Sequence, residues 1–438
     1  MARGESTASW WQRRYIVVLL LFLAVYAIIL VMFMPDMSFV LNDSPVSRQK
    51  LIRSTPSARG IVICLFDAMI PMTVSLVQEL RALGYKDLIQ MYHCDGELSN
   101  VSQRLLRDYD SNIEIIDGCR EMVALGKLRK DQMAGYRSFW LKPLALVHTR
   151  LDEVIIMDAD DLVFQNPSRL FDVPGYQETG TIFFYDREIL KKEFLNNAYE
   201  NQPNLHALVE TFDYAHYGLK KNLSQHLLSS LAWAGDAAHE QDSSIVVVKK
   251  SVAPMAIDVL WHLLEQDRKR IGFSYGDKEL FWLAYELAQK PYYFSPWANS
   301  GAARDDDMTK HPDTLCGGLV QFMPLETEQS EVLHINGGYI FNPYKDHKIE
   351  SMTDPEARIQ ELLAQVPSFI SKRRKRSRPL NKADDDKDPL GSWAQECLVH
   401  RGSQAMRPQD VLSIQQRIKN AVRVAVVQQQ MINATASS

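Results

Sequence analysis

The chain has 438 residues, of which 46% are hydrophobic, and its formal net charge at pH 7 is -5. The apolar content is sufficient for a sizeable core, while the charge, without a polybasic stripe, gives no indication of nucleic acid as a partner. Five cysteines allow at most two disulfides, which excludes a disulfide scaffold, and Cys64, inside an apolar run, is expected to be buried.

The first legible feature is residues 15–34, YIVVLLLFLAVYAIILVMFM, a stretch of twenty residues without a charge. A helix of that length spans roughly 30 Å, the thickness of a bilayer core. Arg13 and Arg14 precede the stretch, so residues 1–14 are predicted to be a cytosolic tail and the rest of the chain lumenal. The alternative, a cleaved signal peptide, fits less well because such apolar regions usually have about 7–15 residues.

A short polar segment with three prolines, residues 35–59, is predicted to be a stem. If the remainder is lumenal, three sequons beginning at Asn100, Asn222 and Asn433 are candidate glycosylation sites. A fourth sequon, at Asn42, is weaker because Pro45 follows it.

Residues 60–350 are predicted to form one catalytic domain of the α/β class. Short apolar runs typical of buried strands alternate with runs whose apolar residues recur at helical spacing. This alternation predicts a mixed, mostly parallel sheet with helices on both faces. The expected strands are 61–66, 87–93, 113–116, 153–158, 181–185, 244–248 and 332–336; the expected helices are 74–83, 136–150, 253–265 and 277–288.

Two regions depart from this pattern. Residues 190–235 contain no clear strand and are predicted to be a helical insertion. Residues 351–438 are predicted to be a charged tail with helices at 355–365 and 408–431, the second of them polar. The basic run 372–376 is interpreted as a solvated loop, with a processing site as the alternative.

The strongest chemical signal is Asp158-Ala-Asp160, which follows the apolar strand 153–158 directly. Ligands of open α/β sheets bind at the carboxyl ends of strands, and paired carboxylates beside a dry sheet need compensation by a cation or by hydrogen bonds. Oxygen ligands suit Mn²⁺ or Mg²⁺, which also bind diphosphates. The motif therefore predicts a site for a metal and a nucleotide diphosphate. The alternative is a capped loop, because Asn166-Pro167 just beyond indicates a turn.

Five further residues are candidates for the same site. Lys142 is expected to contact a phosphate, although a solvated helix lysine is equally compatible. Asp242, in a segment expected to line the acceptor site, and Asp277 and Lys278, at a helix start, are candidate catalytic residues, with an N-cap as the alternative for Asp277. His334 is either a core histidine or a third metal ligand beside Asp158 and Asp160.

Several of these segments, in this order, resemble the fungal-type α-mannosyltransferases of glycosyltransferase family 71. The matching segments are Phe139-Trp-Leu-Lys-Pro-Leu-Ala-Leu146, Asp158-Ala-Asp160 with Asn166-Pro167 and Leu170-Phe-Asp172, Gly180-Thr-Ile-Phe183, 240–249, Gly276-Asp-Lys-Glu-Leu-Phe281 and the segment around His334. The resemblance covers residues 60–345. The chain departs from it at Asp161, where many relatives carry Asn, and in the insertion 190–235.

The resemblance implies a Golgi type II membrane enzyme with a GT-A fold, which uses Mn²⁺ or Mg²⁺ and a nucleotide-sugar donor, GDP-mannose, and makes an α-linked product on a glycan or glycoprotein with retention of configuration. It implies that Asp158 and Asp160 hold metal and donor, that His334 completes the metal shell, and that Lys142 contacts the donor phosphate. Asp277 and Lys278 would lie near the donor sugar or the acceptor.

Three other functions stay open at the level of sequence. A galactosyl or glucosyl donor is the nearest alternative, because the motifs contact the diphosphate more than the sugar. A catalytically inactive carbohydrate-binding protein of the Golgi would keep the same fold. A phosphatase of the haloacid-dehalogenase type also has an apolar strand ending in Asp-x-Asp, although that motif usually opens its domain.

Overall fold

The computed structural model describes residues 58–189, 192–304, 315–342, 354–375, 397–398 and 403–436. The chain from Pro56 to Ser438 forms one compact unit. The predicted transmembrane segment 15–34 and its flanking tail lie outside the described residues, as does nearly all of the stem. Within the described ranges, every helix is too short or too polar to cross a membrane.

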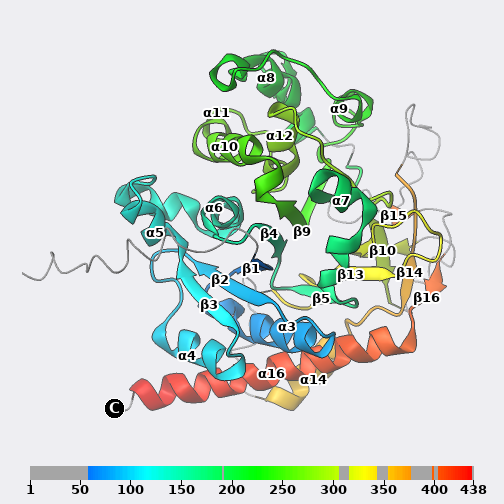
Figure 1. Ribbon diagram of the computed structural model, residues 1–438. Coiled ribbons are helices and arrows are strands. Elements are labelled where there is room, and N and C mark those ends of the chain that lie inside the picture. Colours follow the sequence, from blue (N-terminus) through cyan, green and yellow to red (C-terminus); the bar gives the residue numbers. More distant parts are fainter. Residues whose placement is uncertain are drawn as a thin grey trace, which may run out of the picture. The chain divides into compact units, whose positions relative to one another are not determined.

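A six-stranded sheet with the order β3-β2-β1-β4-β9-β6 forms the centre of this unit (Figure 1). Strands β3, β2, β1 and β4 run parallel to one another, while β9 is antiparallel to both β4 and β6. The expected mixed, mostly parallel sheet is therefore confirmed. Its strands are β1 Arg59–Cys64, β2 Leu88–His93, β3 Ile113–Asp117, β4 Glu153–Met157, β6 Thr181–Tyr185 and β9 Gln241–Lys249.

Both faces of this sheet are buried, because successive side chains of a strand point to opposite sides. In β1, Ile61 and Ile63 belong to one hydrophobic cluster and Val62 to the other, and none of the three is exposed. Helices lie over both faces in Figure 1. Helices α3 Ile70–Ala82, α4 Asn100–Tyr109 and α16 Pro408–Ala436 lie on one side, and α6 Leu141–His148, α10 Pro254–His262 and α12 Leu280–Leu287 on the other.

Two expected helices begin later than predicted. The helix expected at 136–150 begins at Leu141, because Ser138 has a φ of 59°, which interrupts the helical path. The helix expected from Asp277 begins at Leu280 and its N-cap residue is Glu279, so Asp277 is not its N-cap. Gly276, with a φ of 62°, instead turns the chain so that Asp277 is buried.

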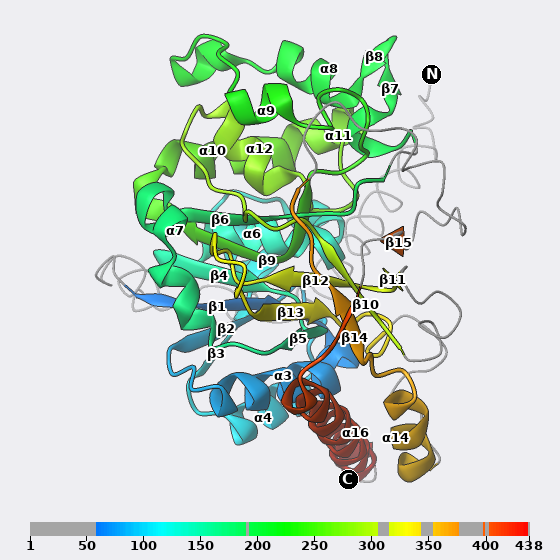
Figure 2. The ribbon, with the colours of Figure 1, turned by 90° about the vertical axis from the view of Figure 1, so that its right-hand side faces the viewer.

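A second sheet, which the sequence did not predict beyond one of its strands, packs beside the first (Figure 2). Its order is β16-β14-β10-β12-β13-β5 and all of its pairs are antiparallel. Its strands are β5 Asp161–Val163, β10 Ser300–Ala303, β12 Gly318–Phe322, β13 Val332–Asn336, β14 Phe369–Ser371 and β16 Gln404–Ala405. These strands are too short for a periodic pattern to stand out in the sequence.

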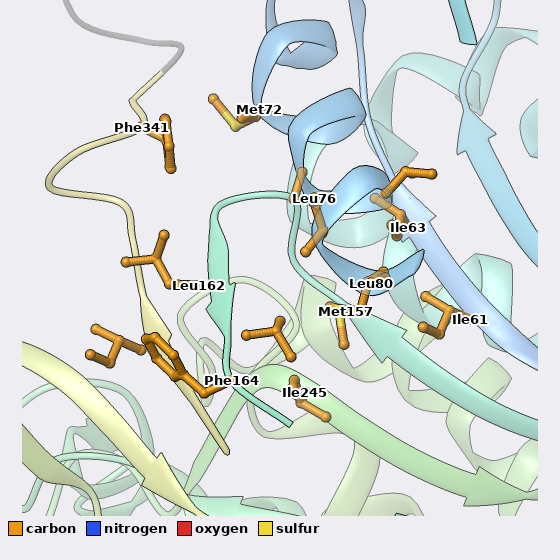
Figure 3. Close-up of a cluster of buried hydrophobic side chains, with 14 of the residues drawn as sticks. Ile61, Ile63, Met72, Leu76, Leu80, Met157, Leu162, Phe164, Ile245 and Phe341 are labelled. Carbon is orange, nitrogen blue, oxygen red and sulfur yellow. The ribbon is translucent and has the colours of Figure 1, made fainter. Parts of the chain in front are cut away.

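The C-terminal helix α16 is not the polar appendage expected from the sequence. It lies against α3 in both views (Figures 1 and 2), and Ile414, Ile418 and Val422 are each at most 1% exposed. These side chains join the cluster that contains α3 and the first sheet, part of which is drawn in Figure 3. The prediction was wrong because the many polar residues of α16 make its apolar spacing hard to recognise in the sequence, although one face of the helix is apolar.

The described part of the basic run is also packed rather than solvated. Lys372 and Arg374 both lie 3.8 Å from the ring centre of Trp297. Arg373 is 8% exposed and is 3.2 Å from Glu188. The interpretation of these residues as a solvated loop is therefore wrong, because the three cations contact Trp297 and Glu188.

The insertion 190–235 is largely helical where it is described, as predicted, with one small hairpin of β7 and β8. Its regular elements are β7 Ala198–Tyr199, β8 Gln202–Pro203, α8 Asn204–Thr211 and α9 Gln225–Ser229. The remaining elements are α5 Gly118–Ala124, α7 Pro174–Thr179, α11 Arg268–Arg270, α14 Pro355–Leu363, β11 Leu315–Cys316 and β15 Cys397–Leu398.

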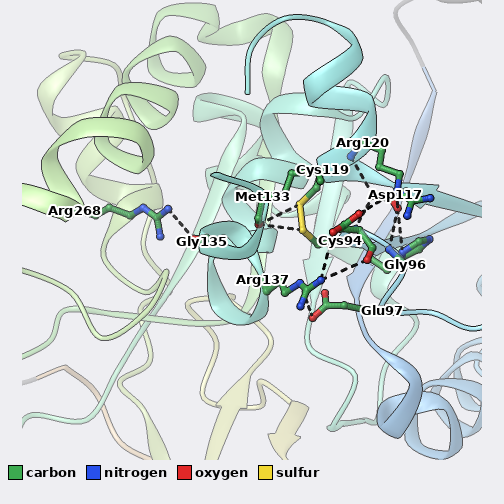
Figure 4. Close-up of a disulfide and its surroundings, with 12 residues drawn as sticks. Cys94, Gly96, Glu97, Asp117, Cys119, Arg120, Met133, Gly135, Arg137 and Arg268 are labelled. Carbon is green, nitrogen blue, oxygen red and sulfur yellow. Dashed lines mark hydrogen bonds and ion pairs between the residues drawn. A yellow bond between two sulfur atoms is a disulfide. The ribbon is translucent and has the colours of Figure 1, made fainter. Parts of the chain in front are cut away.

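A disulfide between Cys94 and Cys119 ties the end of β2 to α5 (Figure 4). Both cysteines are fully buried, beside the backbone carbonyl of Met133. Cys64 is a free thiol that is half-buried, so it is more accessible than expected. Burial raises the pKa of its thiol well above the usual range, which makes it a poor nucleophile.

We predict that Ile418→Ala lowers the free energy of unfolding by about 2–5 kcal/mol, because Ile418 fills the core between α16 and α3. Leu412→Ala on the same helix is the matched control, since Leu412 is 63% exposed, and we expect a change within about 0.5 kcal/mol. Urea unfolding of both variants measures the difference. Equal stability of the two variants would show that α16 is not part of the core.

Candidate active site

The Asp158-Ala-Asp160 motif is the point at which the chain leaves one sheet and enters the other. Strand β4 of the first sheet ends at Met157, and β5 of the second sheet begins at Asp161. Backbone hydrogen bonds hold the crossing on both sides: Asp158 N–H donates to Ser244 at 2.9 Å, and Gly337 N–H donates to Asp160 at 3.1 Å. The motif therefore lies at the carboxyl end of β4, as the sequence predicted.

The Lys142 ammonium lies between two of the predicted site residues. Its Nζ is 2.9 Å from Asp158 Oδ1 and 3.0 Å from Asp277 Oδ2, and it donates to the Ser243 carbonyl at 3.0 Å. Burial opposes the charged form, yet the two carboxylates raise the pKa of Lys142 above its ordinary value. The lysine is thus a cation whose donors are engaged by the protein, and it positions Asp158 and Asp277.

Asp158 itself is suited to a charged ligand. Burial raises its pKa to about 7 and neighbouring carboxylates add to that shift, although Lys142 opposes it. Because 31% of the side chain remains exposed, water offsets part of the burial cost. An added cation would favour the ionised form.

The next acid along the chain, Asp161, has an unusual environment. It is fully buried, and neither carboxylate oxygen has a hydrogen-bond partner among the described residues. Burial raises its pKa well above the usual range, and Asp158, Asp160 and Asp242 raise it further. An isolated buried carboxylate is costly unless it is protonated or binds a cation. In the sequence, Asp161 stands out only as a departure from the family resemblance.

His334 lies on β13, opposite Val163 of β5, so the second sheet brings it to the acids. Its Nε2 is 4.0 Å from Asp161 Oδ1, and neither ring nitrogen has a hydrogen-bond partner among the described residues. Burial lowers the pKa of His334 to about 4, although Asp242 opposes the shift. The imidazole is therefore neutral at physiological pH, the form that binds metals.

These groups fit a divalent cation only in part. Across the described ranges, no group of three or more His, Cys, Asp and Glu side chains is placed to hold a metal ion. However, Mg²⁺-type sites commonly use one or two carboxylates together with phosphate oxygens of a substrate. The orphaned atoms of Asp161 and His334, beside Asp158 and Asp160, fit that kind of site. The predicted ligand set of Asp158, Asp160 and His334 remains a prediction.

Two glycines after β13, Gly337 and Gly338, allow the backbone of this segment to lie directly against Asp160. A Cβ at Gly337 would lie 2.2 Å from the Asp160 carbonyl oxygen, and one at Gly338 would lie 2.9 Å from Asp160 Oδ2. A side chain at Gly337 would displace the backbone of the acidic turn, and one at Gly338 would displace the Asp160 carboxylate. The close approach of this segment to Asp160 therefore requires glycine at positions 337 and 338.

The other two predicted catalytic residues, Asp242 and Lys278, each have buried polar partners. Asp242, inside β9, accepts hydrogen bonds from Ser244 and, at 2.9 Å, from Gln321 Nε2. Lys278 pairs with the buried Asp186. Burial disfavours the Asp186 carboxylate, yet Lys278 lowers its pKa below the ordinary value. Lys278 therefore acts first as a partner of Asp186, which the sequence did not reveal.

The segment from His239 was expected to line an acceptor site, but its first residues are structural. His239 Nδ1 is 3.2 Å from Glu279 Oε1, and its ring stacks on Phe194. Glu279 also accepts a hydrogen bond from Trp282 Nε1 at 2.7 Å. His239 and Glu279 thus connect β9 to α12 rather than facing a ligand.

A pocket of about 140 Å³ lies against the acidic turn. Asp158, Asp160 and Lys142 provide its polar end, and the remaining wall is largely apolar. It is lined by Cys64, Leu65, Phe66, Met69, Met72, Glu97, Ser138, Phe139, Leu141, Lys142, Asp158, Ala159 and Asp160. A concave, mostly apolar pocket with a few convergent polar groups is typical of a small-molecule site.

The acidic turn has a buried support that sequence reasoning missed entirely. Arg417 of α16 is 2% exposed, and its Nη2 donates to the carbonyl of Ala159, the middle residue of the motif, at 2.8 Å. Its Nη1 is 3.0 Å from Glu79 of α3, which accepts a hydrogen bond from Val163 N–H, also at 3.0 Å. Arg417 and Glu79 therefore hold the turn at both ends.

A match to one protein family covers most of the residues of this site. A family model described as "Mannosyltransferase putative" matches residues 58–322, more than half of the chain. The matched range includes Lys142, Asp158, Asp160, Asp242 and Asp277. It ends before His334 and α16.

Curated relatives are fungal. The chain is 25% identical over 249 residues to "Putative alpha-1,3-mannosyltransferase MNN14" of Candida albicans, covering 54% of this chain and 34% of that protein. It is 23% identical over 311 residues to "Probable alpha-1,3-mannosyltransferase MNT4" of Saccharomyces cerevisiae, covering 64% and 50%. It is 22% identical over 319 residues to "Alpha-1,3-mannosyltransferase MNN1" of Saccharomyces cerevisiae, covering 65% and 41%. The matches thus span between a third and a half of each relative.

Solved structures of glycosyltransferases are more distant. Core-mannan synthase A from Aspergillus fumigatus, in an Mn/GDP form, has a TM-score of 0.37 and 9% identity, covering 54% of this chain and 71% of that one. The galactosyltransferase LgtC, in complex with donor and acceptor sugar analogs, has a TM-score of 0.31 and 15% identity, covering 52% and 70%. Both TM-scores are low.

We predict that Arg417→Met destabilises the protein by about 3–5 kcal/mol, because it leaves Glu79 buried and unpaired. The double variant Glu79→Gln, Arg417→Met removes that orphaned charge and should recover most of the stability. It should not recover kcat for nucleotide-sugar turnover, because the Ala159 carbonyl still lacks its donor. Urea unfolding and steady-state kinetics measure the two effects separately.

Arg423→Met is the matched control, since Arg423 is exposed on the same helix. We expect it to change both quantities little. A double variant with wild-type kcat would show that Arg417 stabilises the fold without positioning the acidic turn.

Proposed function

Because the chain belongs to the mannosyltransferase family whose model it matches, we propose that it is a metal-dependent glycosyltransferase. It would transfer mannose from GDP-mannose to a glycan or glycoprotein. The product is an α-linked mannoside, and the names of the fungal relatives support an α-1,3 linkage. The order of the parallel strands and the position of the acidic turn support the GT-A fold.

One observation carries this proposal: the carboxylates at the sheet crossing outnumber the cations that neutralise them. Four aspartates meet there, at positions 158, 160, 161 and 242, and burial raises the pKa of the first three. The nearest cations, Lys142, Lys278 and Arg417, already have carboxylate partners in Asp277, Asp186 and Glu79. The remaining negative charge favours a divalent cation, which would in turn attract a diphosphate.

The residues of the chain would act as follows. The pocket beside the turn would hold the nucleotide, with its diphosphate toward Asp158 and Asp160. Asp158 and Asp160, together with His334, would hold Mn²⁺ or Mg²⁺, which when bound offsets the charge that develops on the departing diphosphate. Lys142 would keep Asp158 in position and reduce the repulsion between Asp158 and Asp277.

Asp277, Lys278 and Asp242 are proposed to surround the sugar and the attacking hydroxyl. Asp242 is hydrogen-bonded by Gln321 and Ser244, which fixes its orientation. The acceptor hydroxyl would attack on the face from which the diphosphate leaves, so that the configuration at the anomeric carbon is retained. Determination of the product anomer by NMR tests this stereochemistry.

For localisation we propose the Golgi membrane, with residues 15–34 as a type II signal anchor and the catalytic unit in the lumen. The asparagines of all three sequons in the folded part, Asn100, Asn222 and Asn433, are exposed. The disulfide between Cys94 and Cys119 is compatible with an oxidising compartment.

The donor is tested with a panel of nucleotide sugars, incubated with the purified lumenal part and Mn²⁺ and scored by released nucleotide. We expect GDP-mannose to give the highest kcat/KM. Preferred release from a UDP-galactose or UDP-glucose donor would support the same fold with another sugar. Hydrolysis of phosphomonoesters without turnover of any nucleotide sugar would support the phosphatase alternative.

We predict that Asp160→Asn lowers kcat about 100-fold or more, because a neutral amide binds a divalent cation weakly. The matched control is Asp108→Asn, since the Asp108 side chain is 61% exposed on α4. Removal of metal with EDTA should abolish turnover of the wild type, and Mn²⁺ should restore it. Turnover of Asp160→Asn at the wild-type rate, with an unchanged response to Mn²⁺, would contradict the assignment.

The topology has a separate test. If the catalytic unit is lumenal, we expect Asn222, in the exposed loop before α9, to carry an N-glycan in a eukaryotic host. Digestion with peptide N-glycosidase should shift the wild type more than Asn222→Gln on a gel. If the digestion shifts neither the wild type nor Asn222→Gln, and the wild type migrates like a variant that lacks all three sequons, the result would contradict a lumenal unit.

A further inference from the structure

Three aromatic side chains gather beside the pocket at the acidic turn. Phe139 lines the pocket, and its ring centre is 5.5 Å from that of Tyr275. Tyr275 in turn is 5.4 Å from Phe194, in an edge-to-face contact. Phe139, Tyr275 and Phe194 come from three segments that are far apart in sequence, and they are called the aromatic platform below.

The platform is exposed where aromatic side chains usually are not. Phe139 is 43% and Tyr275 is 44% exposed. Among the described residues the other exposed aromatic side chains are Tyr109, at 38%, and Tyr339, at 41%. An exposed contact between two aromatic rings leaves apolar area in water, which is unfavourable unless a ligand covers it.

The backbone around the platform is shaped to present these rings. Ser138 and Phe194 have positive φ values, of 59° and 48°, in a region that non-glycine residues rarely adopt. Gly276 lies against Phe139, where an added Cβ would be 2.7 Å from the ring atom Cγ. Strain of this kind persists when surrounding contacts enforce it, and it gathers at ligand sites.

The platform is next to the reacting groups. Phe139 shares the pocket wall with Asp158, Asp160 and Lys142. Tyr275 precedes Gly276 and Asp277, and Asp277 is 3.0 Å from the Lys142 ammonium. Phe194, the third ring of the platform, stacks on His239, which is itself held by Glu279. A ligand lying on the exposed rings would therefore be beside the polar end of the pocket.

We propose that Phe139 and Tyr275 bind a pyranose ring of the acceptor glycan by stacking on its apolar C–H face. The inference rests on the proposed function, and it assigns the acceptor subsite of that same active site. A hexose fits this surface because its ring presents C–H groups on one face while its hydroxyls remain hydrated. A nucleobase fits it less well, since the pocket itself offers an apolar wall of Phe66, Met69 and Met72.

The test is the kinetics of Tyr275→Ala with GDP-mannose as donor and with methyl α-mannoside and an α-linked mannobiose as acceptors. We expect the acceptor KM to rise on the order of tenfold, because one aromatic contact with the sugar is lost. The donor KM should rise by less than about threefold. Tyr275→Phe keeps the ring and should retain most of the acceptor affinity. Tyr109→Ala is the matched control, since Tyr109 on α4 is also an exposed tyrosine, at 38% against 44% for Tyr275.

An unchanged acceptor KM in Tyr275→Ala overturns the inference, and so does a donor KM that rises as much as the acceptor KM, because the rings would then serve the nucleotide. Saturation-transfer NMR of the same sugars, with Mn²⁺ and GDP present, tests the platform without turnover. Loss of the sugar signals in Tyr275→Ala supports the inference, and their absence in the wild type contradicts it. If wild-type protein binds the sugars but turns over no nucleotide sugar, the proposed function fails and the platform stands.

Discussion

The structure depends on how it tolerates three aspartates within four residues at a crossing between two sheets. The chain cannot pass from β4 to β5 without burying Asp161 fully and placing Asp158 and Asp160, both half-buried, beside it, where each charge is costly. Much of the surrounding architecture offsets that cost. Lys142 pairs with Asp158. Arg417 donates a hydrogen bond to the backbone of the turn, and its positive charge opposes the rise in the pKa of Asp160. The charge that is left is a reason to bind a cation and its diphosphate.

The extent of the catalytic unit follows from packing rather than from family similarity. The family match ends at residue 322, yet His334 and the two glycines after it cover the acidic turn from the other side. Helix α16, about a hundred residues beyond the match, provides Arg417 and part of the core beneath α3. A fragment defined by the match alone would therefore lack one wall of its own active site.

The cations of the site also explain how a metal and a donor could be held without a preformed cage. Lys142 and Lys278 are saturated by Asp158, Asp277 and Asp186, so neither is free to replace a divalent ion. Phosphate oxygens would have to complete the coordination, which couples metal binding to donor binding. The aromatic platform beside the pocket would then add a surface for the acceptor that carries no charge and does not compete for the cation.

The sequence by itself determined the parallel strands, most helices and the position of Asp158-Ala-Asp160, because these follow from local periodicity and from an apolar run ending in acids. The second sheet was out of reach, since strands such as β10 and β5 have only three or four residues and are defined by their partners. Only the tertiary structure decided that Lys142 faces two carboxylates, that Lys278 pairs with Asp186, and that Arg417 reaches Ala159. Such contacts join residues as many as 258 positions apart, and no local pattern records them.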